Sequence, residues 1–300
     1  MTQDADRKGA TAYPRAVLDL FDAYVHGAID RRGFVTQCAV HVGSAAAATT
    51  MLAALSPDFA RGQGIKPDDK RIIISHVDIA SPAGNGTVRA YVARPAAKTT
   101  AKLPVVIVAH ENRGLNPHIE DIARRLAVDG YMAVAPDALT TIGGYPGDED
   151  KARAAFATLD RTKIGEDFVA AATHARTMAG SNGKIAAVGF CFGGWIANLL
   201  ATRLPDLRAA VPFYGSPSAL AEVPKIKAQL LIHYAGNDAR TNAAWPEYQA
   251  ALKQAGTHYK AYIYEGAEHG FNNDTTPRFD KAAADLAWAR TLALLRQTIS

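Results

Sequence analysis

The stretch KIAAVGFCFGGWIANLLA, residues 184–201, contains the pattern that decides the fold. Its first part is a short apolar run that ends in Gly-Phe-Cys-Phe-Gly-Gly, and its second part continues directly as an apolar helix pattern. A buried strand that passes at once into a helix is typical of alternating α/β folds. Cys191, one of only two cysteines in the chain, stands at the turn between them.

Glycines flank Cys191 at the two positions where a tight strand-to-helix turn requires them. Gly189 and Gly193 lie two residues before and two residues after the cysteine, and a Cβ atom at either position would clash where the strand and helix backbones converge. The pattern matches a nucleophile elbow with cysteine in place of the usual serine. The N–H groups at the start of the following helix favour a thiolate. We therefore expect Cys191 to be a nucleophile, the alternative being a small, inert core residue.

Strand and helix patterns alternate along residues 70–300. Two strand-like segments, RIIISHVDI and TVRAYVARP, flank ASPAGNG, whose glycines and proline favour a hairpin turn. Further apolar strands are expected in PVVIVAHE, YMAVAPD, KIAAVGF, AAVPFYG, AQLLIHYAGND and HYKAYIYEG. Such strands, alternating with helices, predict a mostly parallel central sheet flanked by helices on both faces. The ligand site of such a sheet lies at the carboxyl ends of its strands.

Residues 1–69 are predicted to form an N-terminal helical arm outside the α/β domain of residues 70–300. The pattern predicts two helices with a break at residues 28–30, with Asp30 as the N-cap of the second helix and Ser56-Pro57 as its stop. We expect this arm to pack on the edge of the sheet or to form contacts between copies of the chain, as in a homo-oligomer.

The arm also contains a twin arginine, Arg31-Arg32, ahead of an alanine-rich run. Twin-arginine export signals have this form, which leaves a periplasmic location open. The pair lies after a helical segment, and His41 dilutes the apolar run. We therefore favour an amphipathic helix in a cytoplasmic protein. A membrane span is not expected because the strictly apolar part is too short.

The composition argues against several classes of function. The net charge is +4 and no basic block is present, so nucleic-acid binding is not expected. Two cysteines provide no disulfide framework and no CxxC pair. The histidines and acids of residues 110–121 match no common metal-ligand spacing. We expect neither a metal nor an organic cofactor.

A base and an orienting acid follow the cysteine in chain order. Asp238 ends the strand pattern LLIHYAGND, and His269 follows the next strand in YIYEGAEHGF. Nucleophile, acid and histidine come in this order in folds with a nucleophile elbow, and a thiolate needs such a base. Alone, Asp238 would be explained as a helix cap and His269 as an ordinary loop histidine. Together with Cys191 they predict a catalytic triad.

An oxyanion hole in this arrangement combines two backbone N–H groups. The first belongs to the residue after the nucleophile, Phe192, and the second to the loop after an earlier strand. That loop is AHENRGLNPHIED, in which we expect the N–H of Asn112 to be the donor.

From about residue 72 onward the chain resembles the dienelactone hydrolase family, whose members are α/β-hydrolases with a cysteine nucleophile. The matching segments are HENRGLNPHIEDIARRLAVDGYMAVAPD, SNGKIAAVGFCFGG, AGNDAR and EGAEHGF. The resemblance implies catalytic roles for Cys191, Asp238 and His269. It also implies that Glu111 contacts the resting cysteine and helps to form the thiolate. Since a carboxylate raises the pKa of a neighbouring thiol, Glu111 is expected to take up a proton or to swing away.

The sequence departs from the family pattern where the type enzymes bind the carboxylate of their substrate. One of two arginines is replaced here by Asn273, and the region of the other reads GDEDKARAAF. The substrate is therefore open, and Arg113 is either a replacement cation or part of a salt bridge. Tyr145, in a glycine-rich loop, and Tyr214, at a strand end, are candidate substrate contacts, with a surface loop and core packing as the alternatives.

These observations predict a carboxylic ester hydrolase, similar to carboxymethylenebutenolidase, that acts on a small-molecule ester or lactone through a thioester at Cys191. Two alternatives remain open at this point. The same site could accept aryl esters or phosphotriesters, or the fold could serve a redox-sensing or binding protein without turnover.

Overall fold

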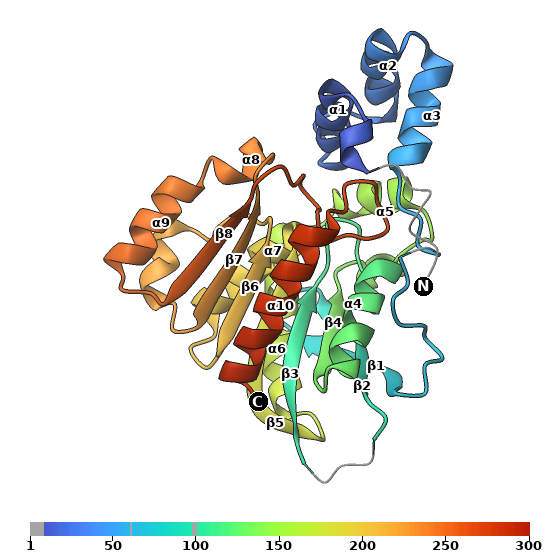
Figure 1. Cartoon of the computed structure of the whole chain (residues 1–300). Coiled ribbons are helices and arrows are strands. Elements are labelled where there is room, and N and C mark those ends of the chain that lie inside the picture. The colour runs from blue at the N-terminus through green and yellow to red at the C-terminus, as the bar shows by residue number, and fades with distance from the viewer. Residues whose placement is uncertain (1–8, 61, 98–100) are drawn as a thin grey trace.

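The computed structural model describes residues 9–60, 62–97 and 101–300, and its centre is one twisted eight-stranded sheet (Figure 1). The strand order is β1-β2-β4-β3-β5-β6-β7-β8. β1 and β2 form an antiparallel hairpin, β2 is antiparallel to β4, and every other neighbouring pair is parallel. The strands are β1 Ile72–Ser81, β2 Gly86–Pro95, β3 Leu103–Ala109, β4 Met132–Asp137, β5 Ser181–Phe190, β6 Ala209–Phe213, β7 Gln229–Ala235 and β8 Tyr259–Tyr264.

Helices cover both faces of the sheet, as the alternating pattern predicts. On one face α4 and α10 pack over residues such as Val106 and Val108, and on the other α6, α7 and α9 pack over Val105 and Ile107. This division follows from the period of two in a strand, which sends successive side chains to opposite faces. The helices of this part are α4 Pro117–Val128, α5 Glu149–Phe156, α6 Arg161–Thr177, α7 Phe192–Arg203, α8 Ala239–Asn242, α9 Trp245–Gln254 and α10 Lys281–Thr298, with short 3₁₀ helices at Thr140–Ile142 and Leu220–Lys225.

The N-terminal arm contains three α-helices, where the sequence predicted two. α1 is Arg15–Val25, α2 is Arg31–Val42 and α3 is Ala45–Leu55, after a 3₁₀ turn at Ala10–Ala12. Asp30 caps α2 as expected by accepting from the Gly33 N–H at 2.6 Å. The predicted second helix breaks at Gly43, whose φ of 88° is left-handed, and Ser44 caps a new helix by accepting from the Ala47 N–H at 3.1 Å. In a Gly-Ser pair the glycine can end one helix and the serine can cap the start of the next.

The arm has a hydrophobic core of its own, separate from the two cores beside the sheet. It is formed by apolar side chains of the three helices, among them Val17, Phe21, Phe34, Cys38 and Leu52. No single helix among the described residues is long and apolar enough to cross a membrane; α2 and α3 meet that test only as a pair, bent by 111°.

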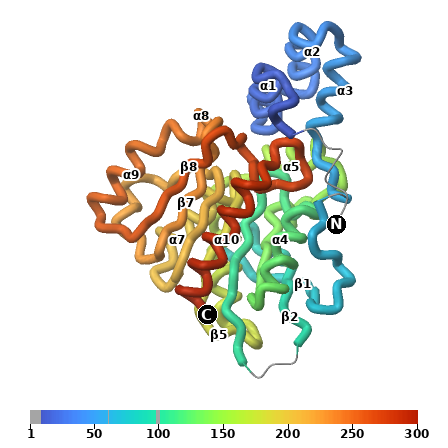
Figure 2. The backbone as a smooth tube through the Cα atoms, viewed as in Figure 1, coloured from blue at the N-terminus to red at the C-terminus, as the bar shows by residue number. Residues whose placement is uncertain are grey.

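The arm lies over the carboxyl ends of the strands, the face where ligand sites are expected (Figure 2). The connection from α3 to β1 runs beside α4, where the Asp121 carboxylate accepts from the N–H groups of Gly64 at 3.0 Å and Ile65 at 2.7 Å. The structure therefore does not show the arm on the sheet edge, because its polar contacts are with loops and helices that follow the carboxyl ends of the strands, such as α4, α5 and α8.

Candidate active site

Cys191 occupies the elbow between β5 and α7. Its backbone has φ 54° and ψ −111°, a strained conformation that non-glycine residues seldom adopt. A Cβ on Gly189 would lie 1.8 Å from the carbonyl oxygen of Gly193, and one on Gly193 would lie 2.0 Å from that of Ala109. The turn thus has the tight geometry inferred from the sequence, and the cysteine is partly exposed at its tip.

His269 and Asp238 lie together beside the elbow. The Nδ1 atom of His269 is 2.5 Å from Oδ2 of Asp238, and both side chains are buried. The other carboxylate oxygen of Asp238 accepts from the Thr241 N–H at 3.0 Å, so this residue is also the cap of α8. The Nε2 atom of His269 hydrogen-bonds to no group in the described part of the chain. A nitrogen of its ring lies within 4.8 Å of the Cys191 sulfur.

The charges around the sulfur favour a thiolate. Burial raises the pKa of the Cys191 thiol, but the neighbouring imidazoles of His269 and His26 outweigh it and lower the pKa to about 5. Burial lowers the pKa of His269, whereas the thiolate and the Asp238 carboxylate raise it to about 10. The pKa of Asp238 falls to about 2 because the His269 hydrogen bond outweighs its burial. Between these values the cysteine and histidine form a thiolate–imidazolium pair.

The arm contributes His26 to the same site, a residue that the sequence analysis did not single out. Its Nε2 atom lies 3.5 Å from the Cys191 sulfur, and its ring meets that of His269 edge-on. The sequence did contain one signal for His26. Asp22 lies four residues before it, a spacing that puts two side chains on the same face of a helix. The Asp22 carboxylate is 3.2 Å from the Nδ1 atom of His26.

Two backbone N–H groups near the elbow remain unpaired. Those of Asn112 and Phe192 donate to no backbone or side-chain acceptor among the residues that the structure describes. The side chain of Asn112 is fixed by the arm, since its amide donates to the carbonyl of Val25 at 2.8 Å. The N–H groups that the sequence predicts as oxyanion donors are thus both unpaired among the described residues.

Glu111 follows β3, and its partners are not the cysteine. Its carboxylate lies 3.5 Å from Nη1 of Arg113 and accepts from the side-chain amide of Asn273 at 3.3 Å. Burial raises the pKa of Glu111, but Arg113 and other neighbouring cations more than offset this and lower it. The pairing with Arg113 and Asn273 favours the ionised form of Glu111, and none of its hydrogen bonds within the described residues goes to Cys191.

Arg113 is buried in ion pairs. Besides Glu111 it contacts Glu149 of α5 at 2.7 Å through Nε. Glu149 in turn accepts from the hydroxyl of Tyr145 at 2.9 Å. The salt-bridge alternative for Arg113 is the one that the geometry favours, and Tyr145 is part of the same polar chain.

Tyr214 lies against the candidate base. Its ring centroid is 4.9 Å from that of His269, and its φ of 38° turns the residue sharply at the end of β6. The side chain is buried, and its hydroxyl has no hydrogen-bond partner in the described part of the molecule. It packs behind the imidazole.

A cavity of about 200 Å³ opens between the arm and the loops that carry Asp238 and His269. Three arginines line it, Arg15, Arg240 and Arg278, and two of these lie close to His26 and its partner Asp22. Arg278 lies 3.4 Å from the Asp22 carboxylate, and Nη2 of Arg240 lies 2.9 Å from Nε2 of His26. Both place a guanidinium group beside the candidate base. Arg240 ends AGNDAR, one of the segments that match the family pattern, whereas Arg278 lies outside those segments.

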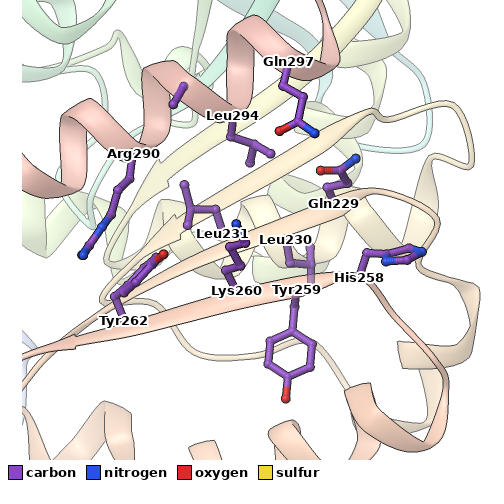
Figure 3. Close-up of a pocket in the computed structure, with 11 residues that line it drawn as sticks. Gln229, Leu230, Leu231, His258, Tyr259, Lys260, Tyr262, Arg290, Leu294 and Gln297 are labelled. Carbon is purple, nitrogen blue, oxygen red and sulfur yellow. The ribbon is translucent and has the colours of Figure 1, made fainter.

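A second cavity, of about 440 Å³, lies at the amino ends of β7 and β8 beside α10 (Figure 3). In Figure 3, Gln229 and His258 lie at one end of this cavity, and Arg290 and Tyr262 lie at the other. No cysteine or carboxylate lines it, and it is at the opposite end of the strands from Cys191, so it is not part of the candidate site.

Three side chains with nitrogen or sulfur donor atoms gather at the elbow. Cys191, His26 and His269 each place one donor atom within 4.8 Å of the others. Thiolate and imidazole are donors that Zn²⁺ accepts. The sequence expectation of a metal-free site considered residues 110–121 and overlooked this set, because His26 and His269 lie far apart along the chain.

The order of the strands, the elbow at the end of β5, and the acid and histidine after β7 and β8 define an α/β-hydrolase. A model of the dienelactone hydrolase family matches residues 88–299, and a YqhI-like family model matches residues 5–42. The chain belongs to the dienelactone hydrolase family and is a dienelactone hydrolase-like hydrolase. The family resemblance and the fold expected from the sequence are thereby confirmed.

Known relatives agree with this placement. A "Putative carboxymethylenebutenolidase" of Saccharolobus solfataricus is 34% identical over 246 residues, which cover 70% of this chain and 94% of the relative. A "Putative hydrolase fragment YghX" of Escherichia coli is 47% identical over 108 residues, 36% of this chain and 92% of the fragment. The crystal structure of a "Putative Dienelactone Hydrolase" from Klebsiella pneumoniae superposes with a TM-score of 0.65 at 28% identity, over 75% of this chain and 99% of that one.

Proposed function

We propose that the protein hydrolyses a carboxylic ester or lactone through a thioester at Cys191, with His269 as proton shuttle and Asp238 as its orienting group. The observation that carries this proposal is the arrangement of the three side chains. The Asp238 carboxylate is 2.5 Å from Nδ1 of His269, and a nitrogen of that ring lies within 4.8 Å of the Cys191 sulfur. Geometry of this kind, rather than sequence position, is how catalytic triads are recognised.

In the first half of the reaction, the thiolate attacks the acyl carbon and the carbonyl electrons move to oxygen. The N–H groups of Asn112 and Phe192, which have no other acceptor among the described residues, stabilise the oxyanion. When the tetrahedral intermediate collapses, the C–O bond breaks and His269 gives its proton to the leaving alkoxide. In a lactone that alkoxide stays attached to the acyl group.

In the second half, His269 takes a proton from water and the hydroxide attacks the thioester carbon. Collapse breaks the C–S bond, restores the thiolate and releases a carboxylic acid. The strained elbow and the low thiol pKa support this sequence, because both present the sulfur as an anion at the surface of the site.

The substrate class is supported by the relatives described as carboxymethylenebutenolidases. Asn273 binds Glu111 and does not replace the missing arginine, so a carboxylate on the substrate is not part of the proposal. A panel of lactones with and without a carboxylate, p-nitrophenyl esters and phosphotriesters separates the proposed activity from the two alternatives.

The decisive experiment is to trap the acyl-enzyme. The full-length protein is mixed briefly with p-nitrophenyl acetate, quenched in acid, and digested for mass spectrometry. We expect one acetyl group, on Cys191. The Cys191→Ala variant should lose hydrolysis while keeping its circular dichroism spectrum. Cys38→Ala, a matched change at the buried cysteine of the arm, should keep full activity. An acetyl group on another residue, or hydrolysis retained by Cys191→Ala, would refute the mechanism.

A further inference from the structure

Two aspartate–histidine pairs converge on the one sulfur atom. Asp238 binds Nδ1 of His269 from the catalytic domain, and Asp22 lies 3.2 Å from Nδ1 of His26 in the arm. His26 then presents Nε2 to the Cys191 sulfur at 3.5 Å. Each histidine therefore has a carboxylate at its outer nitrogen and the sulfur on its inner side.

The surroundings of His26 determine its charge. The Asp22 carboxylate and the Cys191 thiolate favour the protonated ring, and so does the position of His26 at the C-terminal end of α1. Arg240, with Nη2 at 2.9 Å, and the His269 imidazolium disfavour it. Burial lowers the pKa of His26, yet Cys191 and Asp22 outweigh the opposing groups and raise it. A protonated His26 donates Nε2–H to the thiolate. Because that Nε2–H cannot accept from a guanidinium, Arg240 must then leave its position 2.9 Å from the same atom.

His26 occupies a role that Glu111 does not fill in this structure. Glu111 is held by Arg113 and Asn273, and a carboxylate near the sulfur would in any case disfavour the thiolate. A cationic ring 3.5 Å from the sulfur has the opposite effect.

The arm is fixed in place by polar contacts with the catalytic loops. Arg15 donates to Glu268 at 2.9 and 3.0 Å, Asp22 lies between Arg278 and Arg240, and the carbonyl of Val25 holds the side chain of Asn112. Two of these contacts involve the residues beside the base and the oxyanion hole. His26 is therefore placed by the arm as a whole, whose own core is separate from that of the domain.

From this geometry we infer that His26 is a fourth catalytic residue, carried into the site by the N-terminal arm, which binds the Cys191 sulfur and holds it as a thiolate before substrate attack. The inference rests on the proposed nucleophilic role of Cys191 and deepens it. His26 acts on the resting sulfur, while His269 alone transfers protons during turnover.

The test measures the thiolate directly and needs no turnover. Full-length wild type, His26→Gln and His41→Gln are alkylated with iodoacetamide from pH 4 to 10, and mass spectrometry follows the adduct on Cys191. His41 is an exposed histidine of the same arm and serves as the matched control. In His26→Gln we expect the midpoint of the rate profile to rise by about one pH unit and the rate at pH 5 to fall roughly fivefold to tenfold. His41→Gln should match wild type.

A second variant separates the imidazole from the fold of the arm. His26→Ala should show the same rise, and added imidazole should restore part of the rate at low pH. An unchanged midpoint in both His26 variants would overturn the inference, as would an equal shift in His41→Gln. If no acyl substrate is turned over but the midpoint rises, the proposed hydrolysis fails and the role of His26 on the sulfur stands; if esters are hydrolysed and the midpoint is unchanged, only the inference fails.

Discussion

The rings of His26 and His269 meet edge-on, with centroids 4.6 Å apart and an angle of 84° between their planes, although they come from opposite ends of the chain. Through this contact the arm and the α/β domain both contribute to the candidate active site. The contact also places two titratable rings beside one thiol, so the pH dependence of the protein is a property of the cluster.

The first prediction concerns the pH profile of kcat/KM. The active form needs a deprotonated Cys191, with a pKa of about 5, and a protonated His269, with a pKa of about 10. Ester hydrolysis should therefore rise as the pH increases through about 5 and fall above about 10. Initial rates with p-nitrophenyl acetate, corrected for the spontaneous reaction, measure the profile. A single rise near pH 8 to 9, as for an ordinary thiol, would contradict the ion pair.

Asp238→Asn should reduce kcat roughly 10²-fold to 10⁴-fold, because the amide cannot stabilise the His269 imidazolium and favours the wrong tautomer. Asparagine is also a good N-cap, so the stability of α8 should change little. Single-turnover kinetics and thermal unfolding measure the two effects. Asp285→Asn, at an exposed position of α10 that pairs with Lys281, is the control. Equal losses in both variants would show that the effect is not specific to the site.

Gly193→Ala should lower the free energy of unfolding by roughly 3 kcal/mol or prevent folding, because its Cβ would lie 2.0 Å from the carbonyl oxygen of Ala109. Gly9→Ala, where a Cβ meets nothing within 4 Å, should be nearly neutral. Urea unfolding followed by circular dichroism compares the two. A stable, fully active Gly193→Ala would mean that the elbow is less tight than described.

Tyr214→Phe distinguishes packing from substrate contact. The ring packs at a tilt against that of His269, while the buried hydroxyl has no partner among the described groups. Removing it should leave kcat/KM within about threefold and raise the free energy of unfolding by up to about 1 kcal/mol. Steady-state kinetics across the lactone and ester panel provide the measurement. A large rise in KM would instead identify the hydroxyl as a substrate contact.

Arg15→Ala removes the ion pair with Glu268 that helps to hold the arm. Arg15 is half-exposed, so the pair contributes at most about 1 kcal/mol and less at high salt. We expect faster proteolytic cleavage in the connection at residues 56–71, with the difference from wild type shrinking in 1 M NaCl. Lys281→Ala, in an exposed pair within α10, is the comparison. Identical cleavage of all three proteins would show that this contact does not hold the arm.

The local pattern of the sequence determined the α/β domain and the triad candidates. Strand runs, capping residues and the Gly-Phe-Cys-Phe-Gly turn act over a few residues, so their structural consequences could be inferred directly. The same applies to Asp30 as a cap. The break of the second arm helix was missed because Gly43-Ser44 sits in an alanine-rich run, where the helix pattern outweighs a single glycine.

What only the tertiary structure decided is which distant side chains meet. Glu111 is paired with Arg113 and Asn273, and His26 reaches the sulfur from a segment that matches a separate family model. Neither fact has a local signature, because each depends on where a helical arm docks after the sheet has formed. The sequence determined which residue is the candidate nucleophile, and long-range packing decided which charged groups surround it.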